Sequence, residues 1–229
     1  MSAPATTPSP ALEAAHRGLA QVWIAFESEL ANVPIVARLL SRRLRIEDYR
    51  RLLLNLRQQV VEGSRWISRA ASNLSVAHEE LRSLFLRHAV AEHRDFRLIE
   101  ENYAAAGGDL DAIRCGRRNI GSEALSAFMY QAASRPDPLG LLGAMFVIEG
   151  LGERLAGPWA ASIQDQLGLA NDAVSFLAYH GANDGDHLDM FDRALALAVT
   201  DGDVAEDVVR HARIVARLYR LQLEELDHV

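Results

Sequence analysis

Apolar residues recur at the spacing of an amphipathic helix in almost every segment of this chain, and no segment shows the strand-like alternation that turn residues would bound. Short connections leave no linker that would divide the chain. The pattern predicts an all-α, single-domain bundle of about seven helices over residues 11–229, after a disordered lead of residues 1–10. The helices are expected over residues 11–31, 46–73, 75–106, 122–134, 139–167, 171–200, and from the 201–203 turn to 226.

Composition narrows the classes of function. Hydrophobic residues make up 49% of the 229 residues, enough for a core, and the formal charge of −7 gives no reason to expect a nucleic-acid partner. No apolar run approaches the ~18 residues of a membrane span. Cys115 is the only cysteine, so no internal disulfide can form, which fits the cytoplasm. All 24 basic residues are arginine, which excludes a Schiff-base lysine and a P-loop lysine.

A single acidic residue interrupts the most hydrophobic segment. Glu149 lies within residues 142–152, which are otherwise uncharged and predict a helix buried on all sides. A lone buried carboxylate is strongly unfavourable unless it meets a cation, a metal or a proton. Two interpretations follow: Glu149 binds a metal, or it pairs with a buried arginine such as Arg65 or Arg154.

A second segment places metal-ligand side chains on one helical face. His180, Asp184 and His187 are spaced i, i+4 and i+7, and two imidazoles with a carboxylate suit a first-row metal. On an ideal helix His180 and His187 start about 10 Å apart along the axis. That spacing favours either two ions about 3.5–4 Å apart with Asp184 between them, or a locally unwound helix. Gly181 and Gly185 would ease such unwinding.

A third segment repeats this spacing, with His88, Glu92 and Asp95 beside an apolar stripe. In one interpretation the two carboxylates pair with arginines at the edge of the stripe. In the other they join Glu149 and the second segment in one site. Four carboxylates and two imidazoles from three helices resemble the ligand inventory of di-iron sites in helical bundles.

Residues 146–150, 176–180, Asp184 and His187 together resemble the haem-oxygenase-like di-metal oxidases and oxygenases, also called iron-containing redox enzymes. The resemblance covers about residues 85–195 at the level of motifs, and most of the chain at the level of fold. It implies a haem-oxygenase-like helical domain that carries a non-haem di-iron centre.

The resemblance also implies roles for individual residues. The positions that match the family's ligands are Glu149, His180, Asp184 and His187. Glu92 and Asp95 are expected to face them as further ligands, and Glu149 and Glu92 are the expected catalytic carboxylates.

One position departs from the family. Its third helix usually shows a glutamate followed by a histidine, whereas Glu92 is followed by Asp95. Asp95 is expected to ligate in place of the histidine, or else His88 or His93 takes that position. Glu62, on the second helix, is a further candidate ligand.

The cofactor implied is iron, two ions per chain and labile, with manganese as an alternative metal. The implied reaction uses dioxygen to oxidise a small amino-acid-, amine- or fatty-acid-like substrate. An electron donor is required, and the sequence does not identify it. We expect no nucleic-acid or membrane partner, and a homodimer is an assembly compatible with these expectations.

Two other interpretations stay open at this point. His16, in the first helix, occupies the place of the proximal ligand in haem oxygenases, which would make the protein a haem-binding or haem-degrading oxygenase. That interpretation leaves His180, Asp184 and His187 unexplained. The other is a non-catalytic helical binding protein that has inherited the fold.

Overall fold

The computed structural model describes residues 9–228, except for the side chains of residues 183–189. All of the regular structure in the described residues is helical, which confirms the predicted fold class. Four short helical turns of 3-10 or π type, η1 to η4, join or extend the α-helices. The α-helices are α1 (Pro10–Leu30), α2 (Pro34–Leu40), α3 (Ile46–Asn73), α4 (Glu79–Glu92), α5 (Phe96–Ala105), α6 (Leu110–Cys115), α7 (Ile120–Ala133), α8 (Leu141–Leu151), α9 (Gly157–Leu167), α10 (Ser175–Ala198) and α11 (Gly202–Glu224).

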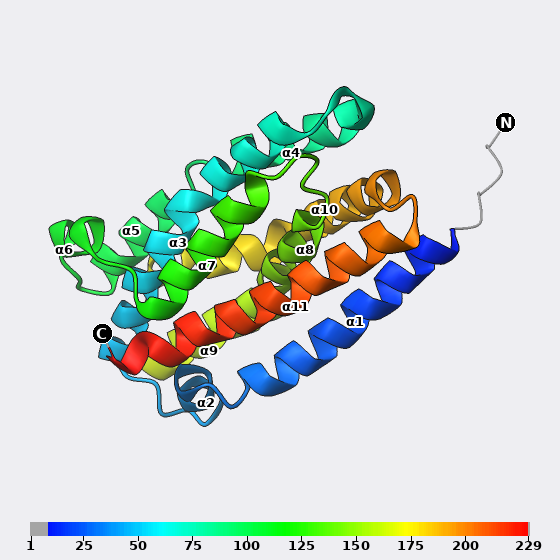
Figure 1. The fold of residues 1–229 in the computed structure, drawn as a ribbon. Helices are drawn as coiled ribbons and strands as arrows, with labels where there is room; N and C mark the ends of the chain where they lie inside the picture. Colours follow the sequence, from blue (N-terminus) through cyan, green and yellow to red (C-terminus); the bar gives the residue numbers. More distant parts are fainter. Residues whose placement is uncertain (1–8, 229) are drawn as a thin grey trace, which may run out of the picture.

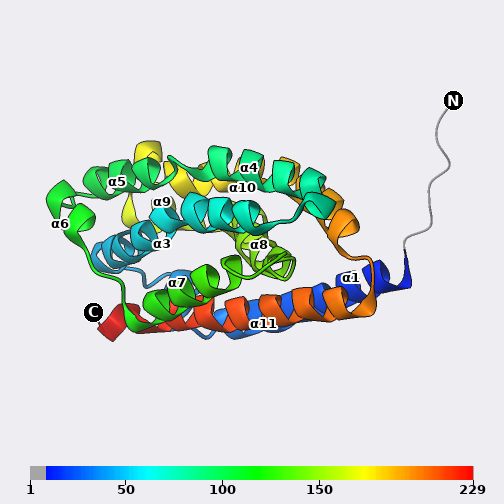
Figure 2. The same ribbon diagram turned by 45° about the horizontal axis from the view of Figure 1, so that its top comes forward.

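The helices form a layered bundle, with α3 and α8 in the middle. In Figure 2, α4, α5 and α10 lie on one side of this middle layer, and α1 and α11 lie side by side on the other. Figure 1 shows the long α3 and α11 running through the molecule. Because α8 is enclosed by helices on both sides, nearly all of its residues are buried, including Glu149. The site described below therefore lies inside the bundle.

Helix starts follow local capping chemistry. Ser9 caps α1 by accepting a hydrogen bond from the backbone N–H of Leu12, and Pro10 follows at the first helical position. Asn119 caps α7 and Asp201 caps α11 in the same way. The first helix thus begins one residue before its predicted start. Residues 1–8, most of the predicted disordered lead, lie outside the described residues.

The predicted helix over residues 75–106 is divided in the structure. After the 3-10 turn η1 (Val76–His78), α4 ends at Glu92, and a turn at residues 93–95 leads into α5. No glycine or proline marks this break, so the continuous apolar pattern suggested one helix. The spacing predicted that His88, Glu92 and Asp95 share one face of one helix. This prediction is wrong, because Asp95 lies beyond the end of α4. The short helices α2 and α6 were also not predicted.

The helix predicted over residues 139–167 is nearly continuous in the structure. The chain continues from α8 into α9 through one π-helical segment, η2 (Gly152–Ala156). Pro158 follows at the first turn of α9, where its missing N–H disturbs the regular hydrogen-bond ladder and a wider turn results. A Cβ on Gly181 would lie 2.6 Å from the backbone N of Gly157, so glycine allows α10 to approach this segment closely.

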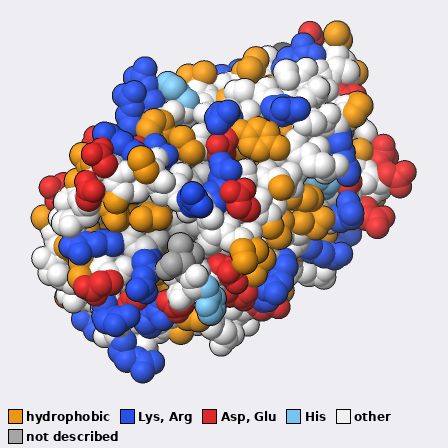
Figure 3. Space-filling model, turned by 60° about the vertical axis from the view of Figure 1, so that its left-hand side comes forward, with side chains coloured by type: hydrophobic (Ala, Val, Ile, Leu, Met, Phe, Trp, Pro, Cys, Tyr) orange, Lys and Arg blue, Asp and Glu red, His pale blue; other side chains and the backbone are white. Residues whose placement is uncertain are grey.

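The surface of the protein carries charges of both signs. On the face shown in Figure 3, arginine and acidic side chains are interspersed with small apolar areas. Within the described part of the chain, no helix combines the length and the hydrophobicity that crossing a bilayer would require.

Candidate metal centre

Three predicted ligands meet where α4, α5 and α10 come together. Glu92 is the last residue of α4, Asp95 precedes α5, and His180 lies in α10. Each offers one ligand atom, and these atoms all lie within 4.8 Å of one another. The Nε2 atom of His180 is 3.4 Å from a carboxylate oxygen of Asp95. The turn at residues 93–95 thus brings Asp95 to His180 although the shared helical face is lost.

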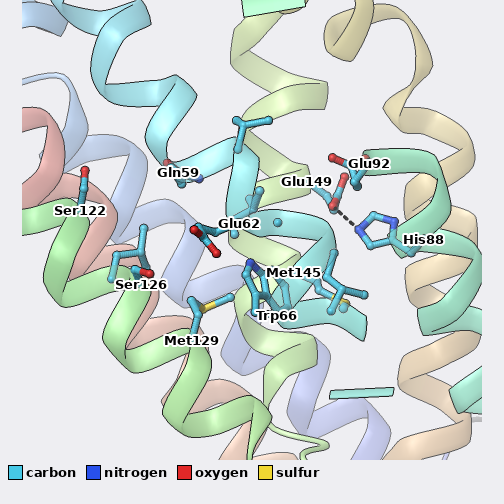
Figure 4. A pocket seen from close by; sticks show the side chains of 15 residues that line it. Gln59, Glu62, Trp66, His88, Glu92, Ser122, Ser126, Met129, Met145 and Glu149 are labelled. Carbon is cyan, nitrogen blue, oxygen red and sulfur yellow. Dashed lines mark ion pairs between the residues drawn. The ribbon is translucent and has the colours of Figure 1, made fainter. Parts of the chain in front are cut away.

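Glu149 meets a histidine and not an arginine. Its Oε1 atom lies 3.0 Å from Nε2 of His88, and both residues are more than 90% buried. Figure 4 shows this pair beside the carboxylate of Glu92. Arg65 pairs with Glu62, and Arg154 lies over the ring of Trp23, so neither is the partner proposed for Glu149 in the arginine interpretation.

The N-terminus of α10 is held in place by a buried amide. Asn102 of α5 donates to the backbone carbonyl of Asp172 and to Ser175, and it accepts from the N–H of Phe176. Tyr49 of α3 donates to the carbonyl of Ala173 at 2.6 Å. These bonds fix the chain just before α10 against α3 and α5, which places His180 one helical turn further along.

The electrostatics of the cluster favour binding of a cation or a proton. Burial and, to a smaller extent, the nearby carboxylate of Glu149 raise the pKa of Glu92 to about 7, against the opposing effect of His88 and His180. No described arginine lies within ion-pair distance of Glu92, Asp95 or Glu149, so imidazoles are their described partners. A divalent cation would neutralise this concentration of negative charge.

Glu62 lies apart from the three clustered ligands. It accepts hydrogen bonds from Arg65, Arg118 and Tyr130. Its side chain nevertheless lines a cavity that reaches Glu149. Glu62 is therefore held by three donors at some distance from the cluster, as Figure 4 also shows.

Two predicted ligands, Asp184 and His187, belong to α10, but their side chains lie outside the described residues.

The position where the family usually has a histidine is occupied by Asp95, which contacts His180. The other candidate for this position, His93, is exposed, and its ring is hydrogen-bonded to the carbonyl of Val90.

Two cavities adjoin the cluster, and Glu92 and Glu149 line both of them. The small cavity, of about 60 Å³, extends from His88 and Glu149 past Met145 to Glu62, Ser122 and Ser126 (Figure 4). The large cavity, of about 100 Å³, extends in the other direction from the cluster. Its walls are formed by Leu52, Leu56, Gln59, Val60, Ile148, Leu151, Gly152, Ala156, Trp159, Phe176, Leu177, His180, Tyr219 and Leu223.

The sequence interpretation missed two polar residues of the large cavity, Gln59 and Tyr219. Both lie on amphipathic helices whose apolar stripes predict burial, but their spacing gives no sign that they face one cavity. It also ranked His88 behind other ligands, although His88 stands four residues before Glu92 and contacts Glu149.

The residues between α1 and α8 do not fit a haem group. The ring of Trp23 fills the contact, because a Cβ on Gly150 would lie 2.7 Å from its Cζ3 atom. Phe146 packs edge-on against the same ring. His16 is exposed and lines neither cavity next to the cluster. The donor set of the cluster, by contrast, consists of carboxylate and imidazole groups and fits iron or manganese.

Solved structures share this fold at low sequence identity. A domain of unknown function with a haem oxygenase-like fold from Shewanella denitrificans OS217 is 17% identical, with a TM-score of 0.87 over 93% of this chain and 91% of that one. A TenA homologue from Pseudomonas syringae pv. tomato DC3000 is 14% identical, with a TM-score of 0.76 over 98% and 99%. A TenA homologue from P. horikoshii OT3 is 17% identical, with a TM-score of 0.63 over 94% and 97%. These similarities establish the haem oxygenase-like fold and no activity.

No curated protein matches the sequence. A family model does: the one described as iron-containing redox enzyme matches residues 65–220, a span that includes both His88 and Glu149 and the whole of α10. With more than half of its length matched in this way, the chain belongs to the family of iron-containing redox enzymes.

Proposed function

We propose that this protein is a non-haem di-iron oxidase or oxygenase that uses dioxygen to oxidise a small amino-acid-, amine- or fatty-acid-like substrate. One observation carries the proposal: three carboxylates and two imidazoles converge inside the bundle without a described arginine among them. A binding protein without a metal would gain no stability from this arrangement, because buried like charges repel one another.

The residues divide into two neighbouring sets of donors. Glu92, Asp95 and His180 would hold one ion, since their ligand atoms already lie within 4.8 Å of one another. Glu149 and His88 lie beside them and would contribute to a second ion. Asp184 and His187 stay proposed ligands on the strength of the family resemblance. Manganese is the alternative metal for the same donors.

When bound, reduced iron supplies electrons to dioxygen. The protein would exclude water from this reaction, because the cluster lies between α4, α8 and α10 and opens onto cavities of limited volume. Burial raises the pKa of metal-free Glu92 to about 7, so metal binding would release a proton from it near neutral pH. Glu149 and Glu92 are the proposed catalytic carboxylates. An external electron donor would complete the reaction.

Anaerobic titration with Fe(II), followed by exposure to air, tests the proposal. We expect uptake of up to two Fe(II) per chain, a change in the visible spectrum on exposure to oxygen, and no intense Soret band after incubation with haem. A matched variant, His16→Ala, should behave as the unmodified protein does, because His16 is exposed on α1. Failure to bind Fe(II) or Mn(II), or a stoichiometric Soret band that His16→Ala abolishes, would contradict the proposal.

A further inference from the structure

The large cavity has an unusual distribution of polar groups. Apart from the carboxylate–imidazole cluster, Gln59 of α3 and Tyr219 of α11 are the only amide and hydroxyl side chains among its described lining residues. No arginine is among those residues, and the chain contains no lysine. A charged group held away from the cluster would therefore meet no opposite charge, and its burial would be unfavourable.

Gln59 is held beside Tyr219 by a neighbouring amide. Nε2 of Gln222 donates to Oε1 of Gln59 at 2.5 Å. The hydroxyl of Ser122 lies 3.0 Å from Oε1 of Gln222 and 2.9 Å from Oδ1 of Asn55, and it donates its one proton to either of them. Gln59 also lowers the pKa of Tyr219, so the two polar groups are neighbours in the cavity wall.

Tyr219 lines the cavity as a neutral phenol. Burial raises its pKa to about 12, so the hydroxyl keeps its proton, and the residue is only 9% exposed. Gln59 is the only described side chain that affects this hydroxyl by hydrogen bonding. A buried hydroxyl hydrogen normally has an acceptor, and a bound molecule in the cavity would supply one.

The large cavity extends from α11 to the carboxylate–imidazole cluster. Tyr219 belongs to α11, whereas Glu92 and His180 belong to α4 and α10 on the opposite side of α3 and α8 (Figure 2). A molecule held at Tyr219 would extend along the apolar walls toward the cluster. A cavity of about 150 Å³ holds benzene, so the volume of about 100 Å³ suits a molecule smaller than benzene, such as a short aliphatic chain.

We propose that Tyr219, beside Gln59, is the specificity-determining residue of the large cavity, and that the substrate has a short apolar body with one uncharged hydrogen-bond acceptor, such as a carbonyl. The proposal rests on the proposed function in that it takes this molecule to be the substrate of the metal centre. It narrows the range of substrates considered above to those whose group at Tyr219 is uncharged.

Binding of three small probes tests the proposal. 2-Butanone has a short apolar body and a carbonyl acceptor, 2-methyl-1-butene has nearly the same shape without the acceptor, and propionate carries a charge. Calorimetric titration would use the full-length protein, once metal-free and once loaded anaerobically with Mn(II). The variant is Tyr219→Phe, and the matched control is Tyr103→Phe, a buried tyrosine of α5 that lines neither cavity.

We expect the unmodified protein and Tyr103→Phe to bind 2-butanone about five- to tenfold more tightly than Tyr219→Phe does, the range that one hydrogen bond gives. 2-Methyl-1-butene should bind the three proteins equally, and propionate should bind more weakly than 2-butanone in the metal-free state. Equal binding of 2-butanone by Tyr219→Phe, preference for propionate, or no binding of 2-butanone at millimolar concentration would overturn the proposal.

These outcomes are independent of the proposed function. Binding of 2-butanone to metal-free protein requires no iron, so it can succeed when iron uptake fails. Conversely, iron uptake with unaltered probe binding in Tyr219→Phe would retain the metal centre and remove the role of Tyr219.

Discussion

Buried carboxylates in this molecule are neutralised in two different ways. Glu100 accepts from Arg57 and Arg114, with a nitrogen of each at 2.9 Å from its oxygens. Glu62 accepts from Arg118 at 2.7 Å and also from Arg65 and Tyr130. Glu92, Asp95 and Glu149 lie at comparable depth, but their described partners are His88 and His180.

The difference shows what each region is suited to do. All 24 basic residues of the chain are arginine, and a guanidinium stays charged at any physiological pH, so Glu62 and Glu100 are permanently neutralised. An imidazole can be neutral, and its nitrogen can then ligate a metal. The region of Glu62 and Glu100 is therefore closed to a cation, whereas the region of Glu92, Asp95 and Glu149 has the proposed role of binding one. The predictions below test this distinction.

The largest effect is expected on metal affinity. His180→Ala removes an imidazole whose ligand atom lies within 4.8 Å of those of Glu92 and Asp95, and no other described nitrogen belongs to that group. We expect the affinity for Mn(II) or Fe(II) to fall by at least about a hundredfold, which exceeds the usual effect of residues outside the ligand shell. Anaerobic calorimetry measures it, and unaltered metal content in the variant would remove the cluster as a metal site.

The arginine-neutralised region should respond in stability and not in metal binding. Arg57→Leu leaves Glu100 with Arg114, whose side chain is half exposed. Removing one partner of a buried ion pair costs about 3–5 kcal/mol. Because Arg114 stays, we expect the free energy of unfolding to fall by about 2–3 kcal/mol. Urea denaturation with and without Mn(II) should show the same loss, and a loss that metal reverses would contradict the distinction.

The sequence predicted the fold and the ligand types better than their geometry. The predicted helix over residues 46–73 has the same bounds as α3, because capping and periodicity are local properties. No feature of the local sequence predicts the turn at residues 93–95. The contact that the turn allows, between Asp95 and His180, is a tertiary one. Similarly, nothing in the spacing indicates that His88 of α4 meets Glu149 of α8, because contacts between helices depend on packing angles.

The predicted roles of the glycines illustrate the same limit. Gly181 was expected to ease unwinding beside His180, which treats it as a local property of the backbone. In the structure it lets α10 approach Gly157 across a helix interface, within a helix that runs from Ser175 to Ala198. A single sequence shows where a side chain is absent, but not which neighbour uses the space.

Glu92 should make the metal-free protein less stable as pH rises. Its unfolded pKa of 4.5 is raised to about 7 in the fold, so between these values the folded state binds the proton more strongly. The favourable contribution of the protonated carboxyl is present below pH 4.5 and is lost as pH rises through about 7. Glu92→Gln should therefore stabilise metal-free protein at pH 8 by about 3–3.5 kcal/mol, since each pKa unit corresponds to about 1.4 kcal/mol.

Urea denaturation in the presence of a chelator, at pH 5 and at pH 8, measures this effect. At pH 5 the two proteins should differ by less than about 1 kcal/mol, because Glu92 is then already protonated in the fold. Destabilisation of Glu92→Gln at pH 8 would show that an unseen cation neutralises Glu92, and it would place this residue with Glu62 and Glu100.

The smallest effect on stability, and the sharpest contrast, is expected at Glu149. Its partner His88 can be neutral, so Glu149→Gln leaves no unpaired charge of the kind that Arg57→Leu leaves at Glu100. We expect the metal-free protein to change by less than about 1 kcal/mol at pH 7. The pKa of Glu92, followed by carbon NMR of the carboxyl, should fall, because the charge of Glu149 contributes to raising it.

The same substitution should weaken metal binding, because a neutral amide is a poor ligand for a hard cation. A loss of about 3 kcal/mol or more in metal-free Glu149→Gln, with Mn(II) binding retained, would mean that Glu149 is half of a structural pair. In that case the imidazole-neutralised region would be a variant of the arginine-neutralised one, and the argument for a metal centre would rest on Glu92, Asp95 and His180 alone.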